Sequence, residues 1–209
     1  MTTLASTPST STPFHSNQII ASNAIIDEFN DKFYVLLQAQ MQSGKTGCGL
    51  YTTFKMLQNK TIQNCFIISG MSDTSIRTQW QNEIKTLGQS YLQLYPDSSS
   101  ELSKIFKNLT KNVYFNRNLE NITDISTISN SLIIIDEIHY GSTANGSLHK
   151  FLHKFGFQNI LQGQECSILS EHNIYILSIT ATRANEDSIY NNENNEDVKK
   201  YWGRVYMEP

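Results

Sequence analysis

The amino-acid sequence predicts an α/β fold in which a mainly parallel β-sheet carries helices on both faces. The main observation is an alternation along the chain. Short apolar segments of β-favouring residues take turns with segments whose apolar residues recur every three to four positions. Strands separated by helices are joined by crossovers, and such crossovers connect parallel strands that are covered on both sides. In addition, the 209 residues suffice to enclose one such core without disulfides or metal ions.

The predicted elements follow one another in a regular order. Residues 1–16 are rich in Ser, Thr and Pro, and we expect a flexible leader there because few apolar groups offset the entropy of ordering. Strands are predicted over residues 33–38, 65–69, 112–115, 132–136 and 174–178. Helices with one apolar face are predicted over residues 17–29, 45–58, 73–87, 102–109 and 147–155. Residues 17–184 therefore form one predicted domain.

Two further segments are predicted to lack regular structure. Residues 89–100 contain a Tyr-Pro-Asp turn and three consecutive serines, which is typical of a loop. Residues 185–209 begin with a polar, acidic and Asn-rich stretch. We expect them to form a linker that leads toward a second domain missing from this sequence.

Composition narrows the class of function. A net charge of −3 and a pI of about 5.9 argue against a strongly basic surface for polyanions, although main-chain amides and hydroxyls can still contact phosphates. No apolar run reaches the roughly 18 to 20 residues that span a bilayer, and the first residues lack the features of a secretion signal. The sequence therefore predicts an intracellular protein, cytoplasmic or nuclear, with no membrane partner and with three free cysteines.

A phosphate loop is predicted where the segment AQMQSGKT, residues 39–46, joins a strand to a helix. Main-chain N–H groups of such a loop and the positive end of the following helix surround a phosphate. Here Gln42, Ser43 and Gly44 would supply the loop. Lys45 would reach the β- and γ-phosphate oxygens, and the Thr46 hydroxyl would ligate Mg²⁺. The segment thus predicts a site for a nucleoside triphosphate.

A second motif, LIIIDEIH at residues 132–139, places two adjacent carboxylates at the carboxyl end of the strongest predicted strand. Ligands of open α/β sheets bind at that end. Asp136 is predicted to hold Mg²⁺ through its water shell, and Glu137 to polarise the water that attacks the γ-phosphate. Alone, Asp-Glu is equally typical of a solvated acidic turn. The two motifs support each other because they occur together and in this order.

With these motifs, residues 17–183 resemble the first lobe of superfamily-two helicases and translocases of the DExH kind. The resemblance implies a RecA-like P-loop NTPase domain that binds and hydrolyses ATP with Mg²⁺. It also implies a nucleic-acid partner, DNA or RNA. Gln18 resembles the glutamine that reads adenine in this family. Thr180 and Thr182 belong to a Thr-Ala-Thr segment that resembles the motif coupling ATP state to lobe movement, with His139 as its partner. Three residues occupy the place of the motif that touches the nucleic-acid backbone: Ser69, Gly70 and Gln79.

The sequence also departs from the family. Gln42 stands where members usually carry glycine, a residue that permits backbone angles other residues resist. The family motor needs a second RecA-like lobe whose arginines complete the ATP site, and 209 residues leave no room for it. We therefore expect a fragment of a longer protein, or a lobe contributed by another chain, and weak or absent turnover by this lobe alone.

Other interpretations stay open. The chain could be a RecA-like binding module that serves as a protein interaction platform without turnover. A stand-alone kinase or GTPase fits less well, because the second and third motifs have no role there. His149 and His153 would share a helix face and could bind a metal with a third ligand, although an exposed helix is the simpler interpretation. Cys48 is either a buried filler or a thiol of lowered pKa. Trp80 and Phe54 are predicted core residues.

Overall fold

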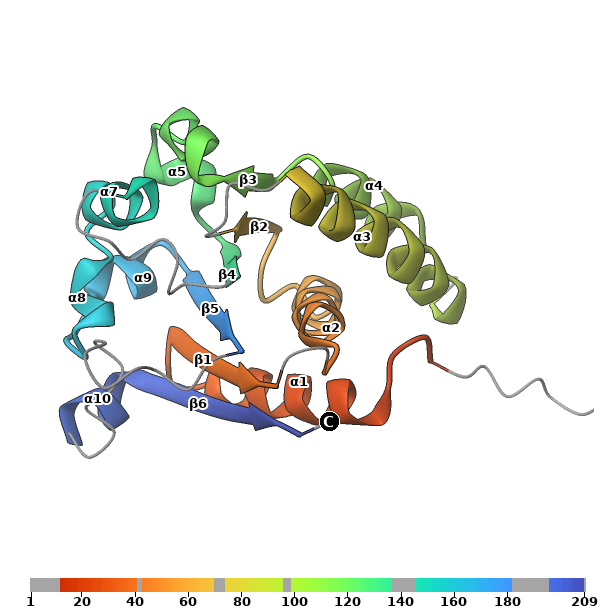
Figure 1. Cartoon of the computed structure of the whole chain (residues 1–209), viewed down its shortest axis with the longest axis horizontal. Helices are drawn as coiled ribbons and strands as arrows, with labels where there is room; N and C mark the ends of the chain where they lie inside the picture. Colours follow the sequence, from red (N-terminus) through yellow and green to blue (C-terminus); the bar gives the residue numbers. More distant parts are fainter. Residues whose placement is uncertain are drawn as a thin grey trace, which may run out of the picture.

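The computed structural model describes residues 12–40, 43–69, 74–95, 99–136, 146–181 and 196–208. The strands of these residues form one six-stranded sheet in the order β3-β2-β4-β5-β1-β6, and every pairing is parallel. Helices cover both faces of the sheet (Figure 1). The predicted RecA-like α/β fold is therefore confirmed.

The strands follow the predicted apolar segments closely. Their bounds are β1 Tyr34–Ala39, β2 Asn64–Ser69, β3 Val113–Phe115, β4 Ser131–Asp136, β5 Ile174–Thr180 and β6 Trp202–Met207. The first five start within one residue of their predicted positions. The sixth was not predicted.

One layer of helices covers one face of the sheet, and a second layer covers the opposite face (Figure 1). The first layer consists of α1 Ser16–Glu28, α2 Lys45–Gln58, α3 Thr74–Leu94 and α4 Ser99–Leu109. The second consists of the 3₁₀ helix η2 Asn116–Asn121 and of α5 Ile125–Ile128, α7 Ser147–Lys154, α8 Gln158–Leu161, α9 Ser167–Glu171 and α10 Glu196–Tyr201. Among the described residues, no helix combines the length and the apolar character needed to cross a membrane.

Apolar residues of the central strands alternate between the two helical layers. In β1, Val35 and Leu37 pack into the core beneath α1 to α4, whereas Tyr34 and Leu36 pack into the core on the other face. Successive side chains of a strand point to opposite faces, so a strand buried on both sides needs an unbroken apolar run. This requirement explains why residues 132–135, all Leu or Ile, were the strongest strand signal in the sequence.

Helix α3 is longer than predicted and includes part of the predicted loop at residues 89–100. The extra turns carry Tyr91, whose ring is buried against Phe54 at 5.2 Å and against Phe106 at 6.4 Å between centroids. The Tyr91 hydroxyl donates a hydrogen bond of 2.6 Å to Gln58 Oε1. Tertiary packing thus extends this helix beyond the point at which the local pattern weakens.

The C-terminal segment is part of the sheet and not a linker. Residues 185–195 of the predicted linker lie outside the described residues, but α10 and β6 follow them. Strand β6 pairs with β1 over its whole length, from Tyr34 opposite Trp202 to Ala39 opposite Met207. The Trp202 ring lies 4.8 Å from that of Tyr34, and its indole N–H donates to the Ile160 carbonyl. The linker expectation is therefore wrong for residues 196–207.

The predicted leader is also shorter than expected. Phe14 is buried, with ring centroids 5.0 Å from Tyr51 and 6.0 Å from Phe54 in edge-on contacts. The His15 N–H donates to Gln18 Oε1 at 2.9 Å at the start of α1. Only residues 1–11 are left to the predicted leader, and they lie outside the described residues.

The position of β6 makes a testable prediction about two neighbouring residues. Val205 is 7% exposed and belongs to the core beneath α1, whereas Tyr206 is 63% exposed. Val205→Asp buries an unpaired charge and is expected to lower the free energy of unfolding by about 3 kcal/mol or more. Tyr206→Asp is expected to lower it by less than about 1 kcal/mol. Urea denaturation of the two variants measures the difference, and equal effects would contradict a paired, one-sided strand here.

Candidate functional site

The two predicted motifs lie at the same end of the sheet. The phosphate loop follows β1, and Asp136 is the last residue of β4. Strand β5 lies between them, with Ile179 paired to both Leu37 of β1 and Asp136 of β4. Adjacent strands are spaced about 4.8 Å apart, so β1 and β4 run roughly 10 Å from each other. Both motifs thus open onto one carboxyl end of the sheet.

The described part of the phosphate loop is a tight turn that leads directly into α2. The Ser43 hydroxyl donates to the Gln40 carbonyl at 2.7 Å, and the Ser43 N–H reaches the same oxygen at 3.3 Å. Gly44 has φ +84°, a left-handed conformation that favours glycine. Its carbonyl accepts the helical hydrogen bond from Cys48 at 3.2 Å. Gln42 lies outside the described residues.

Helix α2 directs its N-terminus at this end of the sheet. It has 14 residues, begins with Lys45 and carries no acidic residue in its first turn. The unpaired N–H groups of a helix N-terminus and the helix dipole together attract an anion. The structure therefore provides an anion-binding helix end at the place where the sequence predicts one.

Gln18 braces the phosphate loop from the side of α1. Its side chain is buried, and its Nε2 donates to the Gly44 carbonyl at 3.0 Å while its Oε1 accepts from the His15 N–H. The amide lies so close to α2 that a Cβ added at Gly44 or Gly47 would lie 2.4 or 2.3 Å from Nε2. Glycine at these positions lets the two helices approach each other.

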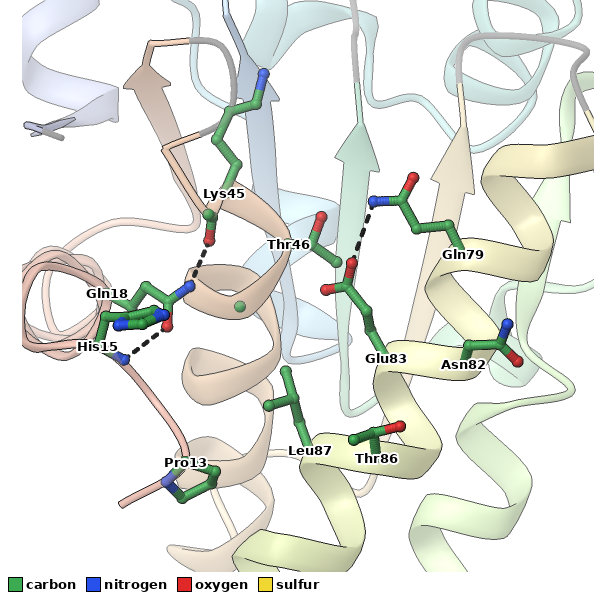
Figure 2. Close-up of a pocket in the computed structure, with 12 residues that line it drawn as sticks. Pro13, His15, Gln18, Lys45, Thr46, Gln79, Asn82, Glu83, Thr86 and Leu87 are labelled. Carbon is green, nitrogen blue, oxygen red and sulfur yellow. Dashed lines mark hydrogen bonds between the residues drawn. The ribbon is translucent and has the colours of Figure 1, made fainter. Parts of the chain in front are cut away.

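A pocket of about 600 Å³ lies between α1, the start of α2 and α3 (Figure 2). Its lining combines side-chain amides, hydroxyls, one carboxylate and apolar groups. It consists of Pro13, His15, Gln18, Gly44, Lys45, Thr46, Gly47, Gln79, Asn82, Glu83, Thr86 and Leu87. Gln79 Nε2 donates to Glu83 Oε1 at 3.1 Å along the α3 wall.

The charged groups around this pocket are separated. Figure 2 shows the Lys45 side chain extending away from Glu83 and Leu87, toward the side on which the strand arrows end. Glu83 lies on the opposite wall, on α3. A carboxylate disfavours a nearby phosphate, whereas an ammonium attracts one. The arrangement suits phosphates on the Lys45 side and an uncharged part of a ligand within the pocket.

Asp136 is held by a side chain from α3. The Trp80 indole N–H donates to Asp136 Oδ2 at 2.9 Å. Trp80 and Phe54 are both buried, as predicted, so they belong to the core. Asp136 and Thr46 both offer hard oxygen ligands, and Mg²⁺ is usually held by one or two such protein groups together with substrate phosphates and water. The donor set therefore fits Mg²⁺.

The remaining predicted residues are buried at strand ends, exposed on α3, or outside the described residues. Ser69 is 1% exposed and pairs in register with Asp136 on the neighbouring strand. Gln79 is exposed on α3, and Thr180 is buried at the end of β5 opposite Gln38. The others lie outside the described residues: Gln42, Gly70, Glu137, His139 and Thr182.

One alternative from the sequence, concerning Cys48, is resolved by burial. Burial raises the pKa of the Cys48 thiol to about 11, although a hydrogen bond from Ser22 opposes this shift, so the thiol is a buried filler and not a reactive one. The rings of His149 and His153 lie 4.7 Å apart on α7. Within the described ranges, no group of three His, Cys, Asp or Glu residues could hold a metal ion.

Sequence reasoning missed the α3 wall of the pocket. Asn82, Glu83, Thr86 and Leu87 were assigned only to a predicted helix. The polar residues follow Gln79 at spacings of three, four and seven, which places them on one helix face. That polar stripe was a usable signal. His15 carried no such signal, because it lies in the segment predicted to be a leader.

Comparison with known proteins identifies a family. Residues 11–185 match a family model described as the type III restriction enzyme, res subunit. The match covers all elements from α1 to β5 and every predicted site residue. Among curated proteins, no match was found.

The contact between Gln18 and Gly47 predicts a non-additive pair of substitutions. Gly47→Ala is expected to destabilise the protein by about 1 kcal/mol, because Gln18 must then give up hydrogen bonds worth about 1 kcal/mol each. In a Gln18→Ala background the same substitution should instead stabilise, because alanine favours a helix over glycine by about 1 kcal/mol. Chemical denaturation of the four proteins measures the cycle. Strictly additive effects would show that the two residues do not touch.

Proposed function

The chain belongs to the type III restriction enzyme res subunit family, which forms a helicase-like ATP-binding lobe of superfamily two, and on this premise we propose its specific role. It is the first motor lobe of a DExH-type, nucleic-acid-dependent ATPase. One observation carries the proposal: the phosphate-loop helix and the Asp136 carboxylate open onto the same end of one parallel sheet. A metal–triphosphate complex needs a cationic loop and a carboxylate at such a place.

The phosphate groups are assigned to the loop and to α2. Main-chain N–H groups of residues 42–44 and of the first turn of α2 bind the β-phosphate, and Lys45 reaches the β- and γ-phosphate oxygens. Thr46 and Asp136 would hold Mg²⁺, which supplies positive charge between the phosphates when it is bound. Glu137 orients the water that attacks the γ-phosphate.

The nucleobase is assigned to the pocket between α1 and α3. Gln18 hydrogen-bonds the phosphate loop at Gly44 and also lines the pocket. Its amide can therefore contact the base while it holds the loop that binds the phosphates. The apolar lining residues Pro13 and Leu87 suit the face of a base, while Asn82 and Glu83 can pair with its polar edge. This division keeps the Glu83 carboxylate away from the phosphates.

Nucleic acid is assigned to the end of β2, the segment that follows it and the exposed first turns of α3. Gly70 and the exposed Gln79 would contact the phosphate backbone, and Ser69, being buried, would support this segment from within. His139, Thr180 and Thr182 would couple the state of ATP to movement of a second lobe. That lobe would be joined to this one in a longer chain or supplied by another chain, and it would complete the site with arginines.

Nucleotide binding provides the first test. ATP with Mg²⁺ at about a hundredfold excess over its Kd is expected to stabilise the wild-type protein by about 2.7 kcal/mol, which a thermal melt detects. Lys45→Ala should lose most of this stabilisation. Lys104→Ala, an exposed lysine on α4, is the matched control and should keep it. The absence of any shift in the wild type would favour an interaction platform instead.

Turnover provides the second test. The chain alone is expected to hydrolyse ATP slowly, because positive charge supplied to the γ-phosphate by a partner contributes about 10³ to 10⁵ in rate in related phosphoryl transfers. Phosphate release measured with and without DNA or RNA checks this expectation. Fast hydrolysis that nucleic acid does not change would contradict the assignment to a motor lobe.

A further inference from the structure

We infer that Trp80 is a positioning residue for the metal site: its indole N–H holds the Asp136 carboxylate in the orientation that Mg²⁺ bound to ATP requires. The inference rests on the proposed function, since it assigns Asp136 to Mg²⁺. It adds a role for a residue that the sequence pattern places in the core.

The first observation is the hydrogen bond itself. Trp80 Nε1 lies 2.9 Å from Asp136 Oδ2, and the Trp80 side chain is only 2% exposed. An indole N–H can only donate, and a buried one needs a partner. A carboxylate offers about four acceptor positions, so this bond can fix its orientation without using up its capacity for a hydrated cation.

The second observation is the rigid packing behind the indole. Trp80 belongs to α3, Asp136 to β4 and Gly49 to the phosphate-loop helix α2. A Cβ added at Gly49 would lie 3.6 Å from Trp80 Cη2, which is van der Waals distance. The same Cβ would meet side chains from β4 and β5 at 3.4 and 3.3 Å. The indole is therefore packed at the place where α2, α3 and the sheet meet.

Through these contacts, the position of α3 determines where the indole N–H of Trp80 meets the Asp136 carboxylate. Groups that hydrogen-bond a metal ligand fix its orientation, and their loss typically costs about 10- to 100-fold in metal affinity. Helix α3 also carries Gln79 next to Trp80, and it follows the segment assigned to nucleic acid. A displacement of α3 would thus move the donor that orients Asp136.

The chain contains a matched control for this residue. It has two tryptophans, and Trp202 is also 2% exposed. The Trp202 indole N–H donates to the Ile160 carbonyl on the opposite face of the sheet. Replacing either tryptophan with Phe removes one buried indole donor, but only Trp80→Phe removes a donor to the metal site.

The experiment compares the Mg²⁺ dependence of ATP binding in wild type, Trp80→Phe and Trp202→Phe, with circular dichroism to check that each is folded. Trp80→Phe should bind ATP without Mg²⁺ as the wild type does, but should need about tenfold more Mg²⁺ for half-maximal tightening of binding. Trp202→Phe should keep the wild-type requirement.

The outcomes separate the inference from the proposed function. If Mg²⁺ tightens ATP binding equally in wild type and Trp80→Phe, the inference is overturned and the proposed function stands. An equal rise in the Mg²⁺ requirement of both variants would also overturn it, because the effect would then follow from stability alone. If the wild type binds ATP without any effect of Mg²⁺, the proposed metal site is wrong and the inference falls with it.

Fluorescence tests the same contact should Trp80→Phe fail to fold. In Trp202→Phe the only indole is Trp80, so its emission reports on the Asp136 carboxylate. Addition of ATP with Mg²⁺ should change that emission, because a bound cation is the largest local charge near the indole. ATP without Mg²⁺ should leave it unchanged. Identical emission under the two conditions, in a protein shown to bind Mg²⁺ and ATP, would overturn the inference.

Discussion

The site depends on one constraint of a parallel sheet: all its strands end on the same side. Each crossover then brings the next helix back from that side, so helix N-termini and strand ends meet there. In this chain the constraint places the start of α2 and the last residue of β4, Asp136, at a common boundary. Lys45, Thr46 and Asp136 stand directly at the start of a helix or the end of a strand and not on a long loop. The central strands themselves bring together the residues to which we assign the metal and the triphosphate.

Burial on both faces keeps this boundary rigid. The central strands send alternate side chains into two separate cores, so a shift of β1, β4 or β5 by one residue would exchange the side chains that fill each core and disrupt the packing of both. Two local sets of contacts then fix the side chains at this end of the sheet. Gly44 and Gly47 admit the Gln18 amide, and Trp80 supplies a donor to Asp136. Through these contacts α1 is connected to the start of α2, and α3 is connected to the end of β4.

Sequence alone predicts the parts of this structure that local patterns encode. Unbroken apolar runs mark the buried strands, and the residue types of the loop around Lys45 and of the strand ending at Asp136 mark the site. Strand β6 was missed because its signal is short and its stability comes from pairing with β1. The Trp80 contact spans 56 residues of sequence, and that of Gln18 with Gly44 spans 26. Such pairs are set by the packing of helices, which no local pattern contains.

The direction of β6 has a consequence for how this lobe joins other polypeptide. Because β6 runs parallel to β1, its last residues arrive beside the end of β1, and the Asn17 side-chain amide donates to the Glu208 carbonyl at 3.1 Å. Chain fused behind this strand would begin its path on the nucleotide side of the sheet. A fused domain would thus start near the site proposed for ATP, and a short tether would raise its effective concentration at that face.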